Sequence, residues 1–279
     1  MKLKKIAGMM LSCLMAGVIF AGCGDTEEKN SDIKLGMISN LNASEQQINE
    51  ILSKVREKSD TKLSPHTVIY HNDLNSMLLG MDSKILQETS VYKSVANYLI
   101  RKNPKYQILE NHTHNAKDSF CFAMLKTNSD IKSDFNSALK KIKNDGTLDK
   151  LVKKYITDLK SGEEPEAVEF QKFNGADTIK VAVTGDLPPF DLISSSGKPA
   201  GFNTALLAEI GKRLEKNIEI IDVDSAARAF ALVSKQADVV FWTIIPVDND
   251  RPSNIDMPDN IDHSDAYFTD EIVHIDLKK

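Results

Sequence analysis

The sequence predicts an α/β fold built from a mostly parallel sheet with helices on its faces. Short apolar runs at 178–183, 218–221 and 239–245 have the composition of buried strands. Apolar residues at helical spacing over 203–214 and 226–233 separate these runs. Alternation of strands with helices builds a parallel sheet, and ligands of such sheets bind outside the carboxyl ends of the strands.

The part of the chain before residue 160 shows the same alternation. Strands are predicted at 33–38, 67–70, 107–109 and 120–125, and helices at 48–55, 74–79, 91–100, 135–142 and 148–156. Asn42 or Ser44 would cap the first of these helices, and a free helix N-terminus would favour an anion. Cys121 lies within an apolar run, which is typical of a small core residue rather than a nucleophile.

The N-terminus has the features of a processing signal. Residues 1–22 combine a lysine-rich start with an apolar run that is too short for a typical membrane span. The run ends at Ala21, Gly22 and Cys23, which resemble the lipobox of bacterial lipoproteins. This resemblance implies cleavage before Cys23 and lipid on that residue. The alternative is an ordinary secretory signal followed by a chance cysteine.

Two polar segments divide the chain. Residues 23–32 hold no large apolar side chain, which predicts a flexible tether and a protein held by lipid at the extracytoplasmic face of the cell membrane. Residues 161–176 begin with a charged stretch that contains glycine and proline, which predicts a linker. The folded chain is therefore expected to consist of 33–160 and 177–279.

The composition argues against several functional classes. The formal net charge is −5, and loss of the signal lysines makes the mature chain more negative, so a nucleic-acid partner is not expected. Processing leaves only Cys23 and Cys121, which provide neither a disulfide framework nor a cysteine metal site. His112 and His114 are close in sequence but lack the spacing of a metal motif. We expect no cofactor and no metal.

Several segments of the second half resemble type 2 solute-binding proteins of ABC transporters, of the amino-acid-binding family 3 type. They are 181–191 with its proline-rich loop, the Gly-Phe-Asn step within 197–203, the strand 237–242, and 264–268. The resemblance covers about 177–275 and matches the first lobe of that family. It implies a fold of two lobes, each a mostly parallel sheet flanked by helices, that close around a ligand.

The first half resembles the family's second lobe, which normally follows the first. Residues 35–47 resemble its first strand and turn, 74–104 a later helix, and 118–156 the family's C-terminal pair of helices. The simplest interpretation is one two-lobed protein with circularly permuted lobe order, since permutation needs only nearby surface termini. Two tandem, truncated binding modules are the alternative.

Binding of a zwitterion requires an apolar or aromatic wall, donors for the carboxylate and an acceptor for the ammonium group. Phe190 could form the wall, or could be a packing residue. Asp186 and Asp191 flank the same loop and could accept from an amine, or could be turn residues. The resemblance adds three candidates: Asn203 in the Gly-Phe-Asn step, and Trp242 and Thr243 at the end of the strand that begins near 237.

The sequence departs from the family where its amino-acid binders usually have an arginine that clamps the carboxylate. After Thr243 the arginine is displaced to Arg251, so ordinary amino-acid recognition is in doubt. Arg228 could replace the clamp or could be a surface residue. On the other lobe, Glu88 or Thr89 is the nearest match to the acidic anchor of the family. Further candidates there are Asn40 and Asn42, whose amides could equally belong to a turn.

We therefore expect a lipid-anchored, monomeric binding protein that captures an amino acid or similar small polar solute between two lobes. Its partner would be the permease of an ABC transporter. A ligand-sensing receptor module that signals to a membrane partner is the first alternative, and a dehydratase-like enzyme on the same fold is the second. Neither a nucleophile elbow nor a phosphate loop occurs in the sequence, so an enzyme is not expected.

Overall fold

The computed structural model describes residues 33–38, 46, 49–50, 53, 66–109, 117–244 and 258–278, with His66 and Ala226 described by their backbone only. The chain clusters into two compact units, Met1–Ser31 and Asp32–Lys279, and every described residue lies in the second. The signal 1–22, the tether 23–32 with Cys23, and the candidates Asn40 and Asn42 lie outside the described residues. Among the described residues, none of the helices has the length and apolar character needed to cross a membrane.

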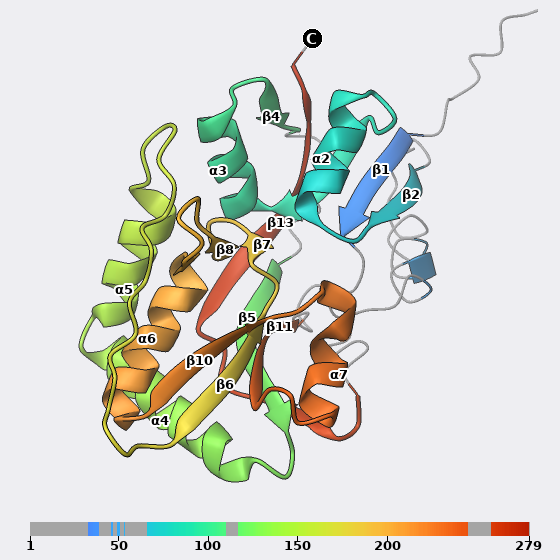
Figure 1. The fold of residues 1–279 in the computed structure, drawn as a ribbon. Helices are drawn as coiled ribbons and strands as arrows, with labels where there is room; N and C mark the ends of the chain where they lie inside the picture. Colours follow the sequence, from blue (N-terminus) through green and yellow to red (C-terminus); the bar gives the residue numbers. More distant parts are fainter. Residues whose placement is uncertain are drawn as a thin grey trace, which may run out of the picture. The chain divides into compact units, whose positions relative to one another are not determined.

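One group of strands, called lobe 1 below, has the order β10-β6-β11-β5-β12 (Figure 1). β6 (Thr178–Val183) lies between β10 (Asn217–Asp222) and β11 (Val239–Ile244), and these three strands run parallel. β5 (Lys117–Leu125) pairs antiparallel with β11 and with β12 (Ile261–His263). The carboxyl ends of the parallel strands therefore share one edge of the sheet.

The other group, called lobe 2 below, has the order β2-β1-β3-β13-β4. β1 (Ile33–Ile38) pairs parallel with both β2 (His66–His71) and β3 (Glu88–Tyr92). β13 (Phe268–Leu277) pairs antiparallel with β3 and with β4 (Tyr106–Ile108). Both lobes thus have three parallel strands followed by one antiparallel strand and a short edge strand.

β13 joins the two lobes into one hydrogen-bonded path. Its first residues, 268–271, pair with β5 of lobe 1, and its next residues, 272–275, pair with β3 of lobe 2. β5 follows the lobe 2 strands in the sequence but lies in lobe 1, whereas β13 follows the lobe 1 strands but lies mostly in lobe 2. Each half of the chain therefore supplies one strand to the other half.

Helices cover the two faces of the lobe 1 sheet, and successive side chains of β11 are buried on opposite faces accordingly. Phe241 belongs to the core cluster that includes α4 and α6, whereas its neighbour Trp242 belongs to the cluster that includes α7. Lobe 2 contains the helices α2 (Leu74–Asp82) and α3 (Lys93–Lys102). Lobe 1 contains α4 (Ser129–Asn144), α5 (Thr147–Val152), α6 (Phe202–Leu214) and α7 (Arg228–Val233). A π-helical turn (Lys153–Thr157) follows α5, and the 3₁₀ turn η3 (Ser225–Ala227) precedes α7.

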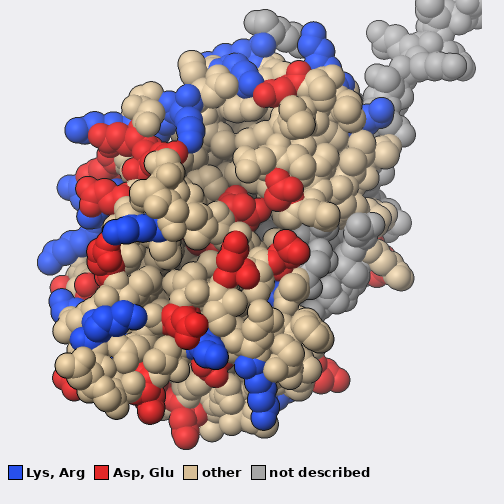
Figure 2. Space-filling model, viewed as in Figure 1, with Lys and Arg blue, Asp and Glu red and all other residues tan. Residues whose placement is uncertain are grey.

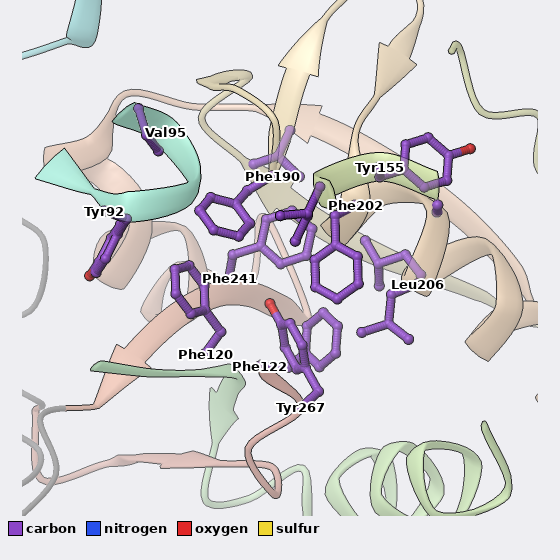
Figure 3. Packing of buried hydrophobic residues seen from close by; sticks show 14 of the residues in the cluster. Tyr92, Val95, Phe120, Phe122, Tyr155, Phe190, Phe202, Leu206, Phe241 and Tyr267 are labelled. Atoms are coloured by element: carbon purple, nitrogen blue, oxygen red, sulfur yellow. The ribbon is translucent and has the colours of Figure 1, made fainter. Parts of the chain in front are cut away.

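An aromatic cluster fills the junction of the lobes (Figure 3). The ring centroids of Phe120 and Phe190 are 4.6 Å apart, and Phe268 lies 5.7 Å from Phe190. Tyr92, at the end of β3, contributes from lobe 2 with its ring 5.0 Å from that of Phe120. Apolar burial of this size is a main source of folding free energy. The core is therefore continuous from one lobe to the other.

A segment without helices or strands leads from α5 to β6. Residues 158–177 pass from α3 of lobe 2, where the Ser161 hydroxyl donates to the Arg101 carbonyl, to lobe 1, where Ala167 forms an isolated bridge with Ala200. Val168 and Phe170 of this segment pack against the core. A small antiparallel sheet, β7 (Asp186–Leu187), β8 (Asp191–Ile193) and β9 (Pro199–Ala200), receives this bridge.

The predicted strands and helices agree with the described structure at most positions, while the helix predicted at 48–55 lies almost wholly outside the described residues. The helix predicted at 91–100 is wrong at its start, because Val91 pairs with Val273 and ends β3, so that α3 begins at Lys93. The strands β3 and β13 are further differences from the prediction: β3 pairs with β13 from the other half of the chain in addition to β1, and all partners of β13 lie in the other half. The prediction for Cys121 is confirmed: the side chain is fully buried, and burial raises the pKa of its thiol to about 12.

Candidate functional site

A pocket of about 610 Å³ lies where the carboxyl ends of β6 and β10 meet the start of α2 from lobe 2 (Figure 2). Side chains from both lobes line it: Asn72 and Asp73 from lobe 2, and Thr184, Asp186, Asp222, Val223, Asp224, Ser225, Ala227 and Gln236 from lobe 1. Its volume is in the range of small-molecule sites. The topology thus places the pocket at the edge where ligands of parallel sheets bind.

A glycine turns the chain from β6 toward this pocket. Gly185 has a φ of +66°, and an added Cβ would come within 2.9 Å of Ile193. A side chain at this position would be strained and crowded, so glycine allows the tight turn that places Asp186 at the pocket.

Two carboxylates from different lobes meet at the N-terminus of α2. Asp73 caps the helix, and its Oδ1 accepts a hydrogen bond of 2.8 Å from the Ser76 amide. The Asp186 carboxylate of lobe 1 accepts from the Leu74 amide of the same helix. Burial raises the pKa of Asp186, with a further contribution from the negative charge of Asp73, while hydrogen bonds oppose the shift.

A second, inner cavity of about 30 Å³ shares Thr184 with the pocket. It has room for little more than one water molecule. Its walls are formed by Tyr92, Phe120, Ala182, Val183, Thr184, Leu187, Asp191, Asn203, Arg228, Phe241, Trp242 and Thr243. The junction of the lobes therefore has a wide polar mouth and a narrow, mostly enclosed interior.

Asp191 is a buried carboxyl in the wall of the inner cavity. Its Oδ2 accepts long hydrogen bonds from the amides of Thr184, at 3.3 Å, and Gly185, at 3.4 Å. Burial raises the pKa of Asp191 to about 7, and the charge of Asp186 adds to this shift. The two amides and the positive charge of Arg228 act in the opposite direction. Asp191 can therefore exchange a proton near neutral pH.

Arg228 supplies the positive charge of the inner cavity. Its guanidinium carbon lies 5.2 Å from the ring centroid of Trp242, within the range of a cation–π contact. Nε donates to the Ser225 carbonyl and Nη1 to the Phe241 carbonyl, each at 3.2 Å. Burial lowers the pKa of Arg228, and the charge of Asp191 opposes this.

A polar network from three strands closes the interior. The Tyr92 hydroxyl lies 3.0 Å from Asp118 Oδ2 and 3.5 Å from Thr243 Oγ1. Burial raises the pKa of Tyr92 well above its usual value, and the charge of Asp118 adds to the shift. Nearby, the Tyr267 hydroxyl donates to Asn203 Oδ1 over 3.0 Å and so fixes the start of α6. These contacts hold cavity residues from both lobes in defined positions.

The structure brings most of the predicted site residues together. Five of them line the inner cavity and Asp186 lines the pocket; the five are Asp191, Asn203, Arg228, Trp242 and Thr243. Phe190 is fully buried in the aromatic cluster and lines neither space. Glu88 also lines neither, and its Oε2 lies 3.0 Å from Nδ1 of His274. Asn40, Asn42 and Cys23 are outside the described residues.

Sequence reasoning missed several residues that line the pocket. Asp222 and Asp224 directly follow the predicted strand at 218–221, and Asp73 follows the one at 67–70. Polar residues just after parallel strands are the signal that could have identified them. Tyr92 was assigned to a helix and so was not considered.

Residues 179–271 match the profile of the family described as bacterial extracellular solute-binding proteins, family 3. The match is confined to this part of the chain, which we call the family 3 segment below. It contains β6, α6, β10 and β11, and therefore the lobe 1 wall of the pocket. The family resemblance inferred from the sequence is confirmed on these residues, and the structure has the two-lobed α/β architecture that the resemblance implies.

A comparison of this chain with curated proteins gives no match. Among solved structures, the ligand-binding component of an ABC-type import system from Staphylococcus aureus has 9% identity and a TM-score of 0.43, over 87% of this chain and 65% of that chain. The GluR0 ligand-binding core in complex with L-glutamate has 10% identity and a TM-score of 0.43, over 89% and 86%. A phosphate-binding protein of Streptococcus pneumoniae TIGR4 has 14% identity and a TM-score of 0.40, over 89% and 90%. Similarities this distant give no information on the ligand of this chain.

The variant Asp191→Asn tests the buried carboxyl. Because the pKa of Asp191 is raised to about 7, the folded protein keeps this proton at pH values where the unfolded chain has released it. The free energy of unfolding of the wild type should therefore fall as the pH rises from about 4 to about 7, by about 1.4 kcal/mol per unit of pKa shift. Asp191→Asn cannot ionise, so we expect it to gain stability relative to the wild type at alkaline pH, measured by urea unfolding.

The matched control is Asp177→Asn, which removes an exposed carboxyl just before β6. It should leave the pH dependence of the wild type unchanged. An Asp191→Asn protein with the same pH dependence as the wild type would contradict the assignment.

Proposed function

We propose that the protein is a lipid-anchored solute-binding protein that captures an amino acid or similar small polar solute between its lobes. The observation that carries this proposal is the pocket itself, whose walls come from both lobes and include the loop after β6 of the family 3 segment. In this proposal the solute is passed to the permease of an ABC transporter.

Ligand capture would act through closure of the lobes. A solute that contacts Asn72 or Asp73 on one side and the loops after β6 and β10 on the other interacts with both lobes only when they are close. Its differential affinity then favours the closed form. β5 and β13 are the strands that pass between the lobes, so they would carry the hinge.

Thr184 connects the pocket with the inner cavity, which gives the proposed site two environments. The wide mouth is polar, while the interior presents Arg228 stacked on Trp242 beside the protonatable Asp191. Arg228 is therefore our candidate for the cation that the displaced family arginine would otherwise provide. A solute would bind in the mouth and direct one small polar group inward.

We also propose that the lobe order is circularly permuted within one two-lobed protein. Each strand position in the two lobes is filled by one strand, and β5 and β13 complete the sheet of the opposite half of the chain. Two tandem modules would not require this exchange of strands. β13 runs antiparallel to β3 and β1 parallel to it, so the end of β13 and the start of β1 lie at the same end of the lobe 2 sheet. The chain could be joined there and opened in 158–177 to give the ordinary family order.

The ligand proposal is tested by a thermal-shift screen of amino acids and polar metabolites. A ligand at a hundredfold excess over its dissociation constant stabilises the folded state by about 2.7 kcal/mol. It should also change the fluorescence of Trp242, the only tryptophan, because Trp242 lines the inner cavity. We expect Thr184→Val to weaken binding about fivefold through loss of one hydrogen bond.

Thr178→Val, which changes an exposed threonine at the start of the same strand, is the control and should bind as the wild type does. If none of the solutes shifts the unfolding temperature, the proposed function is wrong. If both threonine variants bind equally well, the pocket is not the binding site.

The permutation is tested with a rearranged gene. Lys278 is joined to Asp32 through a short flexible linker, and new ends are opened between Gly162 and Glu163. We expect this chain to fold in one cooperative transition and to bind as the wild type does, because the new ends fall in the segment without regular structure. A control with the same join and new ends inside β6 should not fold. Two separate unfolding transitions in the wild-type chain would favour tandem modules.

The anchor is tested by Cys23→Ala in the full-length chain. Removal of the acceptor sulfur should move the protein from the membrane fraction to the soluble fraction of a bacterial host, because lipid chains bind by burying their methylenes. Cys121→Ala removes the buried core cysteine and serves as the control, which should stay with the membrane. Membrane retention of Cys23→Ala would contradict the anchor.

A further inference from the structure

The walls of the pocket are strongly acidic. Four of its lining residues are aspartates: Asp73, Asp186, Asp222 and Asp224. The other lining residues are uncharged, and no described lysine or arginine is among them. Figure 2 shows acidic side chains gathered around the middle of this face. A pocket lined by charges of one sign concentrates solutes of the opposite charge.

The four aspartates are not held in ion pairs by cations of the described chain, although the positive charge of Arg228 acts on Asp186. Ion pairs between described residues occur elsewhere on the surface, for example between Lys93 and Glu271, but none involves the four pocket aspartates. Asp186 and Asp73 approach each other from opposite lobes, and their repulsion contributes to the raised pKa of Asp186. Closure of the lobes therefore brings like charges together, and a bound cation would offset their repulsion.

The arrangement of the carboxylates fits an organic cation better than a metal ion. Within the described part of the chain, no three Asp, Glu, His or Cys side chains are placed so that they could hold one ion. The four carboxylates instead surround a space of about 610 Å³, which suits a molecule with its positive charge on an extended chain.

The inner cavity adds an independent indication that a ligand belongs here. Trp242 is 5% exposed, and its Nε1 donor has no hydrogen-bond partner among the described residues. A buried donor without an acceptor costs free energy. Trp242 lines the inner cavity, which shares Thr184 with the acidic pocket, so a ligand that extends inward could supply the acceptor.

We infer that the solute is an organic cation that carries an amino or guanidino group and an oxygen acceptor. The cationic group lies in the mouth among the four aspartates, and the acceptor points toward Trp242 and Arg228. This inference rests on the proposed function, because it names the chemical class of the solute for the same pocket.

The experiment compares probes of different charge by titration calorimetry at low ionic strength. L-arginine and L-lysine represent the cations, L-glutamine a neutral solute, L-glutamate an anion, and calcium chloride a metal ion. We expect at least one of the two cations to bind tenfold or more tightly than L-glutamine and L-glutamate. Added sodium chloride should weaken this binding, because partly exposed charges are screened.

A double variant that carries both Asp222→Asn and Asp224→Asn removes two exposed charges of the mouth without changing the buried core. It should weaken cation binding at least tenfold, whereas Glu219→Gln, an exposed acid on the same strand as Asp222 but outside the pocket, should not. Folding of both variants is checked by their unfolding temperatures.

Three outcomes would overturn the inference. Tighter binding of L-glutamine or L-glutamate, or cation binding that the double variant leaves unchanged, would contradict the charge assignment while the solute-binding function stands. Binding of calcium that is lost in the double variant would show a metal site instead. Absence of binding by every probe and by the wider metabolite screen would reject both the inference and the proposed function.

Discussion

The exchange of strands between the two halves of the chain is the constraint on which the rest of the structure depends. β13 leaves lobe 1 beside β5 and enters lobe 2 beside β3 without a break in its hydrogen bonding. The rings of Phe120 and Phe268, on these two strands, lie 5.8 Å apart at the crossing. Because neither half can complete its own sheet, the position of the pocket between the lobes is fixed by the same contacts that fold the protein.

The crossing also explains how polar groups are tolerated in the interior. Asp270, on β13, accepts a hydrogen bond of 3.0 Å from the Ser94 amide at the start of α3, and Asp118, on β5, accepts from Tyr92. A buried carboxyl is costly unless such partners are present. Asp191 accepts long hydrogen bonds from the amides of Thr184 and Gly185, at 3.3 and 3.4 Å, and from the Thr184 hydroxyl, at 3.5 Å, and burial raises its pKa. A carboxyl pKa raised in this way is typical of functional positions.

The sequence predicts those parts of the fold and site that depend on local pattern. Runs such as 178–183 identify β6, and the ends of predicted strands identify Trp242 and Asp186. β3 and β13 are not predictable in this way, because all pairing partners of β13, and one of the two partners of β3, lie in the other half of the chain. The direction of the Phe190 ring likewise depends on Phe120 and other distant rings. Asp73, Asp222 and Asp224 were missed because they are far apart in the sequence, and only the fold brings the ends of β6 and β10 to the start of α2.

The antiparallel course of β13 beside β3 has a practical consequence for measurements of lobe motion. Ile33 begins β1 and Leu277 ends β13, and only β3 separates these strands, so the two ends of the described fold are roughly 10 Å apart, two strand spacings. Fluorophores attached at both ends would move together with lobe 2 and would not detect domain rotation. A dye in 167–173, which contacts lobe 1, paired with a dye at either end would convert rotation into a change of energy transfer.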